Sequence, residues 1–388
     1  MKNILQIIGI GFLSISSASA LAISKAQTAA KKSLFATLQN SYTPQAILND
    51  VGKYISHDTD PQGILSSLIL VRISKQLITM DNMKDQIPSS IFTNGILEKI
   101  VNEHAKTGWI ETPQSIENAI EATKAACVIS KLSPDEVSID TWQPLTEKWH
   151  DEEILNCLSG NLEPHHLSGL KWAFDVFGTS CALPNEIQNA YDELNLPFRV
   201  RTGICKGLPG LSVANLIEEV NFKQDDIRTQ SNRVVKERRK TAWQGDEHVD
   251  PFAYSGKSME RDSWSRAVIS VRDFLKQETG EYYDGCLLNL YPDGCSGMRY
   301  HIDPDQGDLW DYETAVVSIG ATRRFSFRNI PDTDKKDTKP HVFVLFEGDV
   351  TEMFGDCQLK YQHTVKTAEG KHDTASRASL VFKRTFSG

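Results

Sequence analysis

The sequence predicts an α+β protein: an N-terminal α-helical domain followed by a double-stranded β-helix, or jelly-roll, domain. Two patterns indicate this order. From about residue 41 to residue 225, proline-marked helix starts recur and apolar residues follow them at helical spacing. From residue 226 to residue 388, short apolar or alternating segments are separated by Gly, Asp and Pro, which is typical of antiparallel strands.

Composition is that of a globular, multi-domain protein. The chain has 388 residues, of which 40% are hydrophobic, enough for two or three ordinary cores. Its net charge of -9 argues against a wholly basic surface that coats nucleic acid. The 7 cysteines include no Cys-x-x-Cys pair, which favours free thiols in a reducing compartment over a disulfide framework or a zinc site.

The first forty residues have the character of a targeting sequence. Residues 1–22 combine Lys2, the apolar run 4–13 and a small-residue cleavage site, the three parts of a signal peptide. The run is too short to span a bilayer comfortably, so no membrane segment is expected in the mature form. Residues 23–40 are basic and rich in Ala, Ser and Thr, like a transit peptide. Together they resemble the two-part presequence of complex plastids; the alternative is a plain signal peptide that leads to the secretory pathway.

Residues 41–225 are expected to form a stack of helical hairpins. Prolines stand where helices should begin, after a polar residue that can cap the first turn, at Pro44, Pro61, Pro113, Pro134 and Pro164. The segment 167–178 loosely resembles a motif of organellar RNA-binding helical repeats. The predicted role is therefore contact with a protein or RNA, or a plain scaffold. His165-His166 is interpreted as a solvated helix start.

Residues 226–388 are expected to contain one amphipathic helix, Trp264–Gln277, ahead of a set of strands. The predicted strands are Cys286–Tyr291, Ala315–Gly320, Arg324–Arg328, His341–Phe346, Leu359–Val365 and Ala378–Lys383.

A His-x-Asp pair after a turn signal is the strongest chemical feature. His301 and Asp303 lie two residues apart, so on an extended segment both side chains point to one face. His363, in another strand-like segment, would complete a two-histidine, one-carboxylate set. Such a set leaves coordination positions open for reactants and suits non-haem Fe(II).

Seven elements occur in an order that resembles the core of the AlkB family of 2-oxoglutarate- and Fe(II)-dependent dioxygenases. They are Asn289-x-Tyr291, His301-x-Asp303-x-Asp305, the segment 316–321, Arg323/Phe325/Phe327, Gly348-Asp349, His363 and the segment 377–383. The resemblance covers roughly residues 230–386. It implies Fe(II) as the cofactor, with 2-oxoglutarate and O2 as cosubstrates.

The same resemblance assigns a cosubstrate pocket. Arg377 corresponds to the first Arg of the family's Arg-x-Asn-x-x-x-Arg signature and would pair with the distal carboxylate through its planar fork. Tyr291 would add its hydroxyl, and Asn289 would lie by the metal-bound end.

Two positions depart from the signature. Ser379 replaces its Asn and Lys383 its second Arg, and by the resemblance both would still contact 2-oxoglutarate. Lys383 keeps the charge but loses the fork, so the carboxylate end near the iron would be held by fewer fixed hydrogen bonds. Arg384 follows directly, but adjacent strand residues face opposite sides, so it cannot take the place of Lys383 without a bulge.

The substrate is expected to be an N-alkylated base in DNA or RNA, by resemblance to nucleic-acid-repairing family members. Tyr254 would pack on a flipped base, Trp243 is a second aromatic that could stack on a base, Asp305 would accept a hydrogen bond from the base, and Arg239 and Lys240 would hold phosphate. By the same resemblance, residues 239–246 and 252–256 would form a lid over the nucleotide, and the two aromatics could equally be packing residues of that lid. Two alternatives remain open at this point. One is a protein-modifying dioxygenase, and the other is a weakly active binding module on a helical scaffold that contacts RNA or protein.

Overall fold

The computed structural model describes residues 47, 60, 63–85, 92, 95–109, 112–158, 160–179, 181–228, 232–331, 339–368 and 374–386. The predicted signal peptide, 1–22, and transit-like segment, 23–40, lie outside these residues. So do the predicted helix starts at Pro44 and Pro61. No helix among the residues described is long and apolar enough to cross a membrane.

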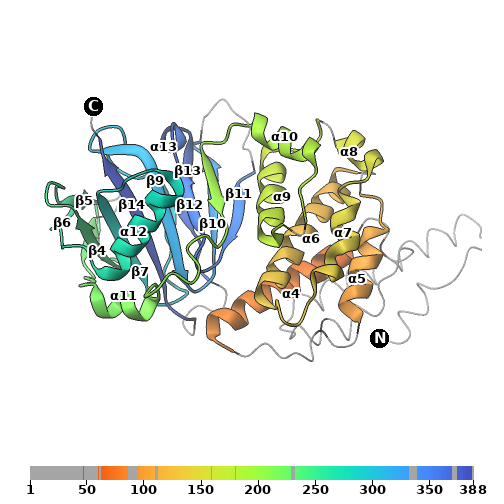
Figure 1. The fold of residues 1–388 in the computed structure, drawn as a ribbon, viewed down its shortest axis with the longest axis horizontal. Coiled ribbons are helices and arrows are strands. Elements are labelled where there is room, and N and C mark those ends of the chain that lie inside the picture. The colour runs from red at the N-terminus through yellow and green to blue at the C-terminus, as the bar shows by residue number, and fades with distance from the viewer. Residues whose placement is uncertain are drawn as a thin grey trace, which may run out of the picture. The chain divides into compact units, whose positions relative to one another are not determined.

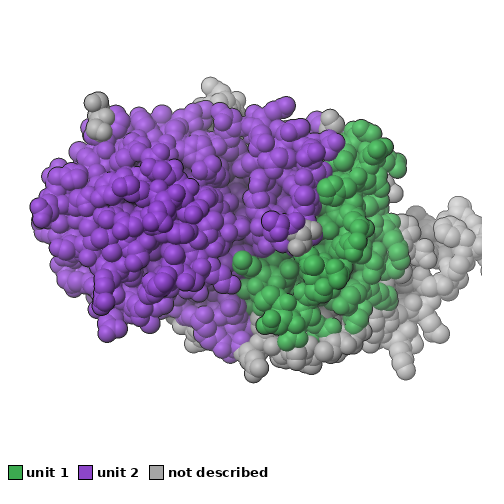
Figure 2. Space-filling model, in the orientation of Figure 1, with its two compact units in different colours: residues 1–77, 87–159 green, residues 78–86, 160–388 purple. Residues whose placement is uncertain are grey.

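The chain divides into two compact units, coloured separately in Figure 2. Unit 1 comprises residues 1–77 and 87–159, and unit 2 comprises residues 78–86 and 160–388. This division differs from the boundary predicted at 225/226, because residues 160–225 belong to the unit that contains the sheets.

Unit 1 is helical. Its elements are α4 (Ile64–Met83, whose last turns belong to unit 2), α5 (Ile96–Ala105), α6 (Pro113–Leu132), η3 (Ile139–Trp142), α7 (Gln143–Lys148) and α8 (Glu152–Leu158). The predicted start at Pro113 is confirmed, with the Thr112 hydroxyl accepting a hydrogen bond from the Ser115 N–H at 3.1 Å. The predicted start at Pro134 is wrong: a turn forms there, closed by the Val137 N–H on the Ser133 carbonyl.

Unit 2 combines helices with antiparallel strands (Figure 1). Its helices are α9 (Pro164–Phe177), α10 (Asn185–Glu193), α11 (Val213–Glu219), α12 (Arg266–Thr279) and α13 (Cys357–Lys360). Its strands are β1 (Phe198–Arg201), β2 (Asp226–Arg228), β3 (Val234–Lys236), β4 (Lys240–Gly245), β5 (Phe252–Tyr254), β6 (Lys257–Met259), β7 (Gly285–Tyr291), β8 (Met298–His301), β9 (Trp310–Gly320), β10 (Arg323–Asn329), β11 (His341–Leu345), β12 (Val350–Met353), β13 (Tyr361–Val365) and β14 (Arg377–Thr385).

Two sheets form the body of unit 2. The larger has the order β1-β12-β9-β14-β7-β4 and the smaller β11-β10-β13-β8. Each predicted strand overlaps an observed one, although Leu359 and Lys360 belong to α13. The predicted helix is confirmed as α12. β1 was not predicted, since it lies within the region expected to be helical. Its residues form a strand because they pair with β12 at the edge of the larger sheet.

The larger sheet has one face for the core and one for chemistry. Along β14, Ala378, Leu380 and Phe382 join the apolar cluster that α11 and α12 cover with residues such as Leu216 and Val271. Figure 1 shows these two helices against that sheet. Because side chains alternate along a strand, Arg377, Ser379 and Lys383 face the other way.

That other face meets the smaller sheet. Phe198 of β1 stacks on Phe327 of β10 at 3.9 Å between ring centroids, which joins the two sheets. The smaller sheet is covered in turn by α9, where Ser168 Oγ lies 2.7 Å from Nδ1 of the buried His341 on β11. The space between the sheets is therefore lined by the inward residues of β14, β7, β8 and β13.

Candidate active site

The three predicted metal ligands converge between the sheets. His301 ends β8 and pairs directly with His363 of β13, so the two imidazole centroids lie 4.2 Å apart. Asp303 follows two residues after His301, and its Oδ1 lies 3.6 Å from His301 Nε2 and 3.5 Å from His363 Nε2. One ligand atom from each of the three lies within 4.8 Å of the others. The structure thus brings together residues 60 positions apart, as the sequence predicts.

The hydrogen bonds prepare this cluster for a cation. His301 Nδ1 lies 2.9 Å from the Arg299 carbonyl oxygen and donates to it, which leaves Nε2 as the lone-pair nitrogen. Within the described part of the chain, that Nε2 is buried with no hydrogen-bond partner. Burial, reinforced by the neighbouring His363, lowers the pKa of His301 to about 3, so its imidazole is neutral at neutral pH.

Asp303 supplies the negative charge. Burial alone would raise the pKa of Asp303, but Lys383 and the two histidines hold that pKa well below its usual range. Two imidazoles and one carboxylate form the donor set that non-haem Fe(II) takes, with the remaining positions open. His301, Asp303 and His363 therefore fit an iron ion.

Two further side chains fix Asp303. Lys383 Nζ donates to Asp303 Oδ2 at 2.9 Å, and the Asp303 N–H donates to Gln358 Oε1 at 2.9 Å. The sequence assigned Lys383 to the cosubstrate and did not single out Gln358. The structure gives Lys383 a direct contact with the acidic ligand. Gln358 lies in α13, five residues before His363, and only its burial marks it as part of the site.

The predicted cosubstrate residues line the inward face of β7 and β14. Arg377 pairs with Tyr291 and Ser379 with Asn289 across the two strands. Asn289 Nδ2 lies 3.3 Å from Ser379 Oγ, so the serine partly takes the place of the signature's amide as a polar neighbour. Antiparallel pairing of two strands with polar residues at every second position is what gathers these four side chains.

Arg377 is poised for an anion. It is buried, its Nη2 donates to Ser318 Oγ at 2.9 Å, and within the described residues its Nε and Nη1 have no partner. Burial lowers the pKa of Arg377, with Tyr291 opposing that effect. A carboxylate brought by a ligand would accept charge-assisted hydrogen bonds from these free N–H groups.

The basic segment ahead of β4 is tied to a buried glutamate. Glu237 accepts hydrogen bonds from the Tyr254 hydroxyl at 2.8 Å, from Arg239 Nε at 2.8 Å and from Lys257 Nζ at 3.2 Å. Lys257 also pairs with Asp225 at 2.8 Å. The sequence did not single out Glu237, because a lone acid in a basic run carries no signal of its contacts.

Two residues predicted to bind the substrate, Arg239 and Trp243, are buried in the structure. Arg239 is buried and turned toward Glu237, so its predicted phosphate contact is not what the structure offers. Trp243 was predicted to stack on a base, but it is 1% exposed and packs against Phe252 and Trp310. Trp243 is a core residue, because β4 pairs with β7 and turns its indole inward.

The other substrate candidates remain accessible. Lys240 is exposed, as is Asp305, and Tyr254 is half-buried. Asp305 has a φ of 57° in the turn that leads into β9, where its carbonyl accepts the Trp310 N–H. Arg384 and Lys383 are adjacent on β14, and their side chains point to opposite faces of the sheet, as predicted. Arg384 pairs with Asp311 at 2.5 Å.

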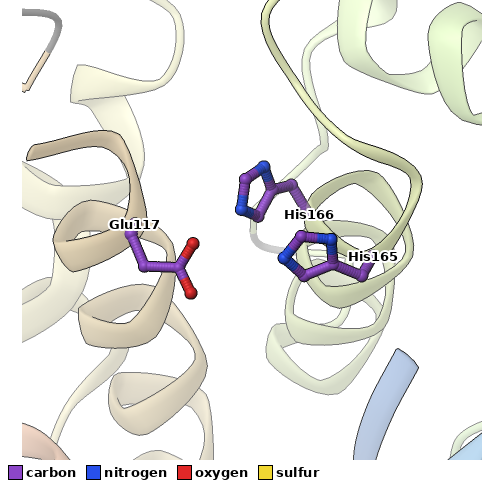
Figure 3. Close-up of side chains that lie close together, drawn as sticks. All are labelled: Glu117, His165 and His166. Atoms are coloured by element: carbon purple, nitrogen blue, oxygen red, sulfur yellow. The ribbon is translucent and has the colours of Figure 1, made fainter. Parts of the chain in front are cut away.

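Three further residues of metal-binding type come from different units of the chain. Figure 3 shows His165 and His166 at the start of α9, with Glu117 on α6. Glu117 belongs to unit 1 and the histidines to unit 2. The interpretation of His165-His166 as solvated is wrong for His166, which is buried and whose ring Nδ1 accepts the Glu163 N–H at 3.1 Å.

A cavity of about 1060 Å³ within unit 2 lies away from the metal ligands. It is lined by α9, α10 and β1 together with the end of α12. Its cations are already matched by acids, as in Lys171–Asp175 and Arg201–Glu278. The charged residues that line this cavity therefore indicate no particular class of ligand.

Comparison with known proteins agrees with the geometry. Residues 211–383 match the model of the 2OG-Fe(II) oxygenase superfamily. An uncharacterized protein, R406 of Acanthamoeba polyphaga mimivirus, is 29% identical over 170 residues, 44% of this chain and 85% of that protein. The bovine alpha-ketoglutarate-dependent dioxygenase alkB homolog 3 is 26% identical over 201 residues, 48% of this chain and 66% of that protein.

The human DNA oxidative demethylase ALKBH2 is 27% identical over 149 residues, 38% of this chain and 56% of that protein. A solved structure, "The structure of OsALKBH1", aligns with 49% of this chain and 98% of its own at 16% identity and a TM-score of 0.33. These alignments span just under two thirds, or less, of the two named mammalian relatives. The matched region contains His301, Asp303 and His363. Residues 211–383 of this chain are thus similar to the 2-oxoglutarate- and Fe(II)-dependent oxygenases, and among them to AlkB homologues.

Proposed function

We propose that this protein oxidatively demethylates N-alkylated bases in DNA or RNA, with Fe(II) as cofactor and 2-oxoglutarate and O2 as cosubstrates. The sheet order, with its ligands on neighbouring strands of the smaller sheet, further supports a double-stranded β-helix as the fold of the domain. The convergence of His301, Asp303 and His363 opposite Arg377 is the observation on which the oxygenase chemistry depends.

Each side chain has a task in this reaction. His301, Asp303 and His363 would hold the iron, which supplies the activation of O2. Arg377 and Tyr291 would hold the distal carboxylate of 2-oxoglutarate, and Asn289 with Ser379 would lie beside its other end. The burial of Arg377 excludes water from that contact, which strengthens it.

The overall reaction balances as follows. One atom of O2 enters the succinate that forms when 2-oxoglutarate loses carbon dioxide, and the other becomes a hydroxyl on the N-methyl carbon. The hydroxymethyl amine then breaks its C–N bond, which leaves formaldehyde and the demethylated base.

The nucleic-acid substrate is supported by the name of one relative, the DNA oxidative demethylase ALKBH2, and by an exposed basic strip. The strip consists of Lys236, Arg238 and Lys240, which are all exposed at the end of β3 and the start of β4. The half-buried Tyr254 lies on β5 in the same lid region. Cations beside an aromatic ring suit a nucleotide that has left its stack.

The test is a substrate screen with the iron-loaded full chain. Methylated DNA and RNA oligonucleotides and a panel of peptides are incubated with 2-oxoglutarate, and succinate and formaldehyde are measured. We expect formaldehyde from at least one methylated oligonucleotide, and none from the His301→Ala variant. Succinate in the absence of any substrate would still report the oxygenase chemistry.

A charge-reversal variant separates the substrate classes. Arg238→Glu/Lys240→Glu is preferred to any change of Arg239, because Arg239 is part of the buried Glu237 network. The variant should lose nucleic-acid turnover and keep uncoupled succinate formation, and Lys360→Glu, exposed on α13, is the matched control. Turnover of a peptide with none on methylated bases would indicate a protein-modifying dioxygenase. Binding of RNA or protein without any turnover would indicate a binding module.

A further inference from the structure

A second buried arginine lies beside the cosubstrate pocket. Arg323 begins β10 and is 2% exposed. Its Nη1 donates to the Thr322 carbonyl at 3.1 Å and its Nη2 to the Asp293 carbonyl at 3.2 Å. Both acceptors are uncharged, and among the residues that the structure describes its Nε has no partner.

The backbone holds Arg323 next to Arg377. Gly320, three residues before Arg323, pairs with Arg377 across β9 and β14. The Ala321 N–H donates to the Ser376 carbonyl at 3.1 Å, so the turn that leads into β10 is fastened to the residue before Arg377. Ser376 Oγ donates in turn to the Pro292 carbonyl at 2.9 Å, beside the Asp293 carbonyl that binds Arg323. Burial and then the charge of Arg377 lower the pKa of Arg323 to about 10, although Asp293 and Tyr291 oppose this shift.

Two buried guanidinium groups close to one another would be stabilised by an anion bound between them. Like charges in a low-dielectric site repel strongly, and each buried cation also loses its hydration. No ion pair joins either arginine to a carboxylate among the described residues, and three of their nitrogens lack hydrogen-bond partners: Arg323 Nε, Arg377 Nε and Arg377 Nη1. A carboxylate brought by a ligand would satisfy both needs.

We propose that Arg323 is a second cosubstrate-binding residue, which with Arg377 forms a two-cation site for the distal carboxylate of 2-oxoglutarate. This inference rests on the proposed function, because that function supplies the dicarboxylate. It gives the pocket a specificity: a 2-oxo acid with a distal carboxylate is favoured over one without it. A purely structural Arg323, which only ties the loop at 292–293 to β10, would not discriminate between such ligands.

The experiment measures ligand binding in the full chain loaded with Mn(II), which removes turnover from the readout. Calorimetric titrations use N-oxalylglycine, an unreactive analogue that keeps the distal carboxylate, and oxalate, which chelates the metal but lacks it. The variants are Arg323→Met, Arg323→Gln, Arg323→Lys and Arg377→Met. Arg324→Met is the matched control, because Arg324 is the next residue of the same strand and faces the other side.

We expect Arg323→Met to weaken N-oxalylglycine binding roughly tenfold or more, the size of one lost charge-assisted hydrogen bond, and to leave oxalate binding unchanged. Arg323→Lys should recover part of the loss and Arg324→Met should show none. If Arg323→Met does not fold, the comparison of Arg323→Gln with Arg323→Lys decides on the same criterion. Unchanged N-oxalylglycine binding, or an equal loss for both ligands, would overturn the proposal. Failure of the wild-type chain to bind N-oxalylglycine would instead reject the proposed function.

Discussion

At the scale of single residues, the site depends on how buried charges are matched. Asp303 is matched by Lys383 at 2.9 Å, and that contact is made with the oxygen that does not face the two histidines. The lysine therefore orients the carboxylate and leaves its other oxygen for a metal. Side chains that fix metal ligands in this way affect metal affinity without touching the ion.

Replacing Lys383 tests this directly. Lys383→Met should weaken Mn(II) binding to the full chain roughly tenfold to a hundredfold, because the carboxylate loses the cation that orients it. Lys383→Arg should retain most of the affinity, and Lys360→Met on α13 serves as the control. The measurement is a titration followed by electron paramagnetic resonance of the free ion. Equal affinity of Lys383→Met and the wild type would show that Asp303 is positioned by other contacts.

A histidine in unit 1 makes stability depend on pH. Ser66 Oγ donates to Asp60 Oδ2 at 2.8 Å, so it accepts from His104 Nδ1, 2.7 Å away. His104 Nε2 then has no proton and, among the described residues, no partner. Burial lowers the pKa of His104 from 6.5 to about 3. Below pH 6.5 the unfolded chain therefore binds a proton that the folded chain does not.

Acid therefore destabilises the folded state through His104. The stability that the neutral imidazole provides is complete above pH 6.5 and is lost as the pH falls toward 3. Thermal unfolding of the wild type should shift to lower temperature between pH 7 and pH 5, and the shift should be smaller in His104→Gln. The midpoint is measured by circular dichroism in matched buffers. Identical pH dependence of the two proteins would assign the effect to other groups.

At the scale of elements, β4 shows how an aromatic residue can be misassigned. Trp243, Phe252 and Trp310 pack together, with centroid distances of 4.9 Å between the first two and 5.2 Å from Trp243 to Trp310. The indole N–H donates to the Asp250 carbonyl at 3.0 Å. Trp243 thereby joins β4, β5 and β9, so its contribution belongs to stability.

Trp243→Ala should destabilise the protein by about 3–5 kcal/mol, the usual cost of removing a large buried aromatic side chain. Trp243→Phe should cost less, since it keeps most of the packing. Urea denaturation followed by circular dichroism gives both values. Tyr254→Phe, which removes only the hydroxyl bonded to Glu237, is the comparison for the lid. A stable Trp243→Ala variant with weakened nucleic-acid binding would restore the predicted stacking role.

Short-range patterns predicted α12, the metal ligands and six strands of unit 2: β7, β9, β10, β11, β13 and β14. Period-two alternation fixed which side chains of β14 share a face, and the His-x-Asp spacing identified two ligands on one segment. Contacts between distant strands left no such signal. The pairing of Lys383 with Asp303 and the closure of Glu237 on Arg239 and Tyr254 depend on tertiary packing, which no local pattern reports.

The edge strand β1 was missed for a similar reason. Its four residues alternate apolar and basic, but they lie in a short stretch rich in Pro and Gly, and only pairing with β12 makes them a strand. The helix start at Pro134 failed because the polar and acidic residues after it form a turn and make no second turn of helix.

At the scale of the whole molecule, the sheets recruit residues from well before the matched domain. Phe198 of β1 is buried in unit 2, together with the α9 residues that cover β11. The end of α4 belongs to the same unit, where Asn82 Nδ2 donates to the Thr322 carbonyl at 2.9 Å.

Fragments test this organisation. Residues 160–388 should fold with a clear thermal transition, whereas residues 226–388 should be less stable or insoluble, since each buried apolar side chain that is lost removes about 1.5–3 kcal/mol. Circular dichroism melting and N-oxalylglycine binding are measured on both. Equal melting temperatures would place the independent unit at the boundary near residue 226.

The position of β14 also has a kinetic consequence. This strand follows all the others of its sheet along the chain, yet it lies between β9 and β7, so the middle of the sheet is filled last in sequence order. Pairings of such long sequence separation slow folding, because loop closure must precede the contacts that reward it. The Arg377 and Lys383 side chains can reach their partners only when that insertion is complete. Refolding followed by a metal-bound chromophore should therefore lag behind refolding followed by far-ultraviolet circular dichroism.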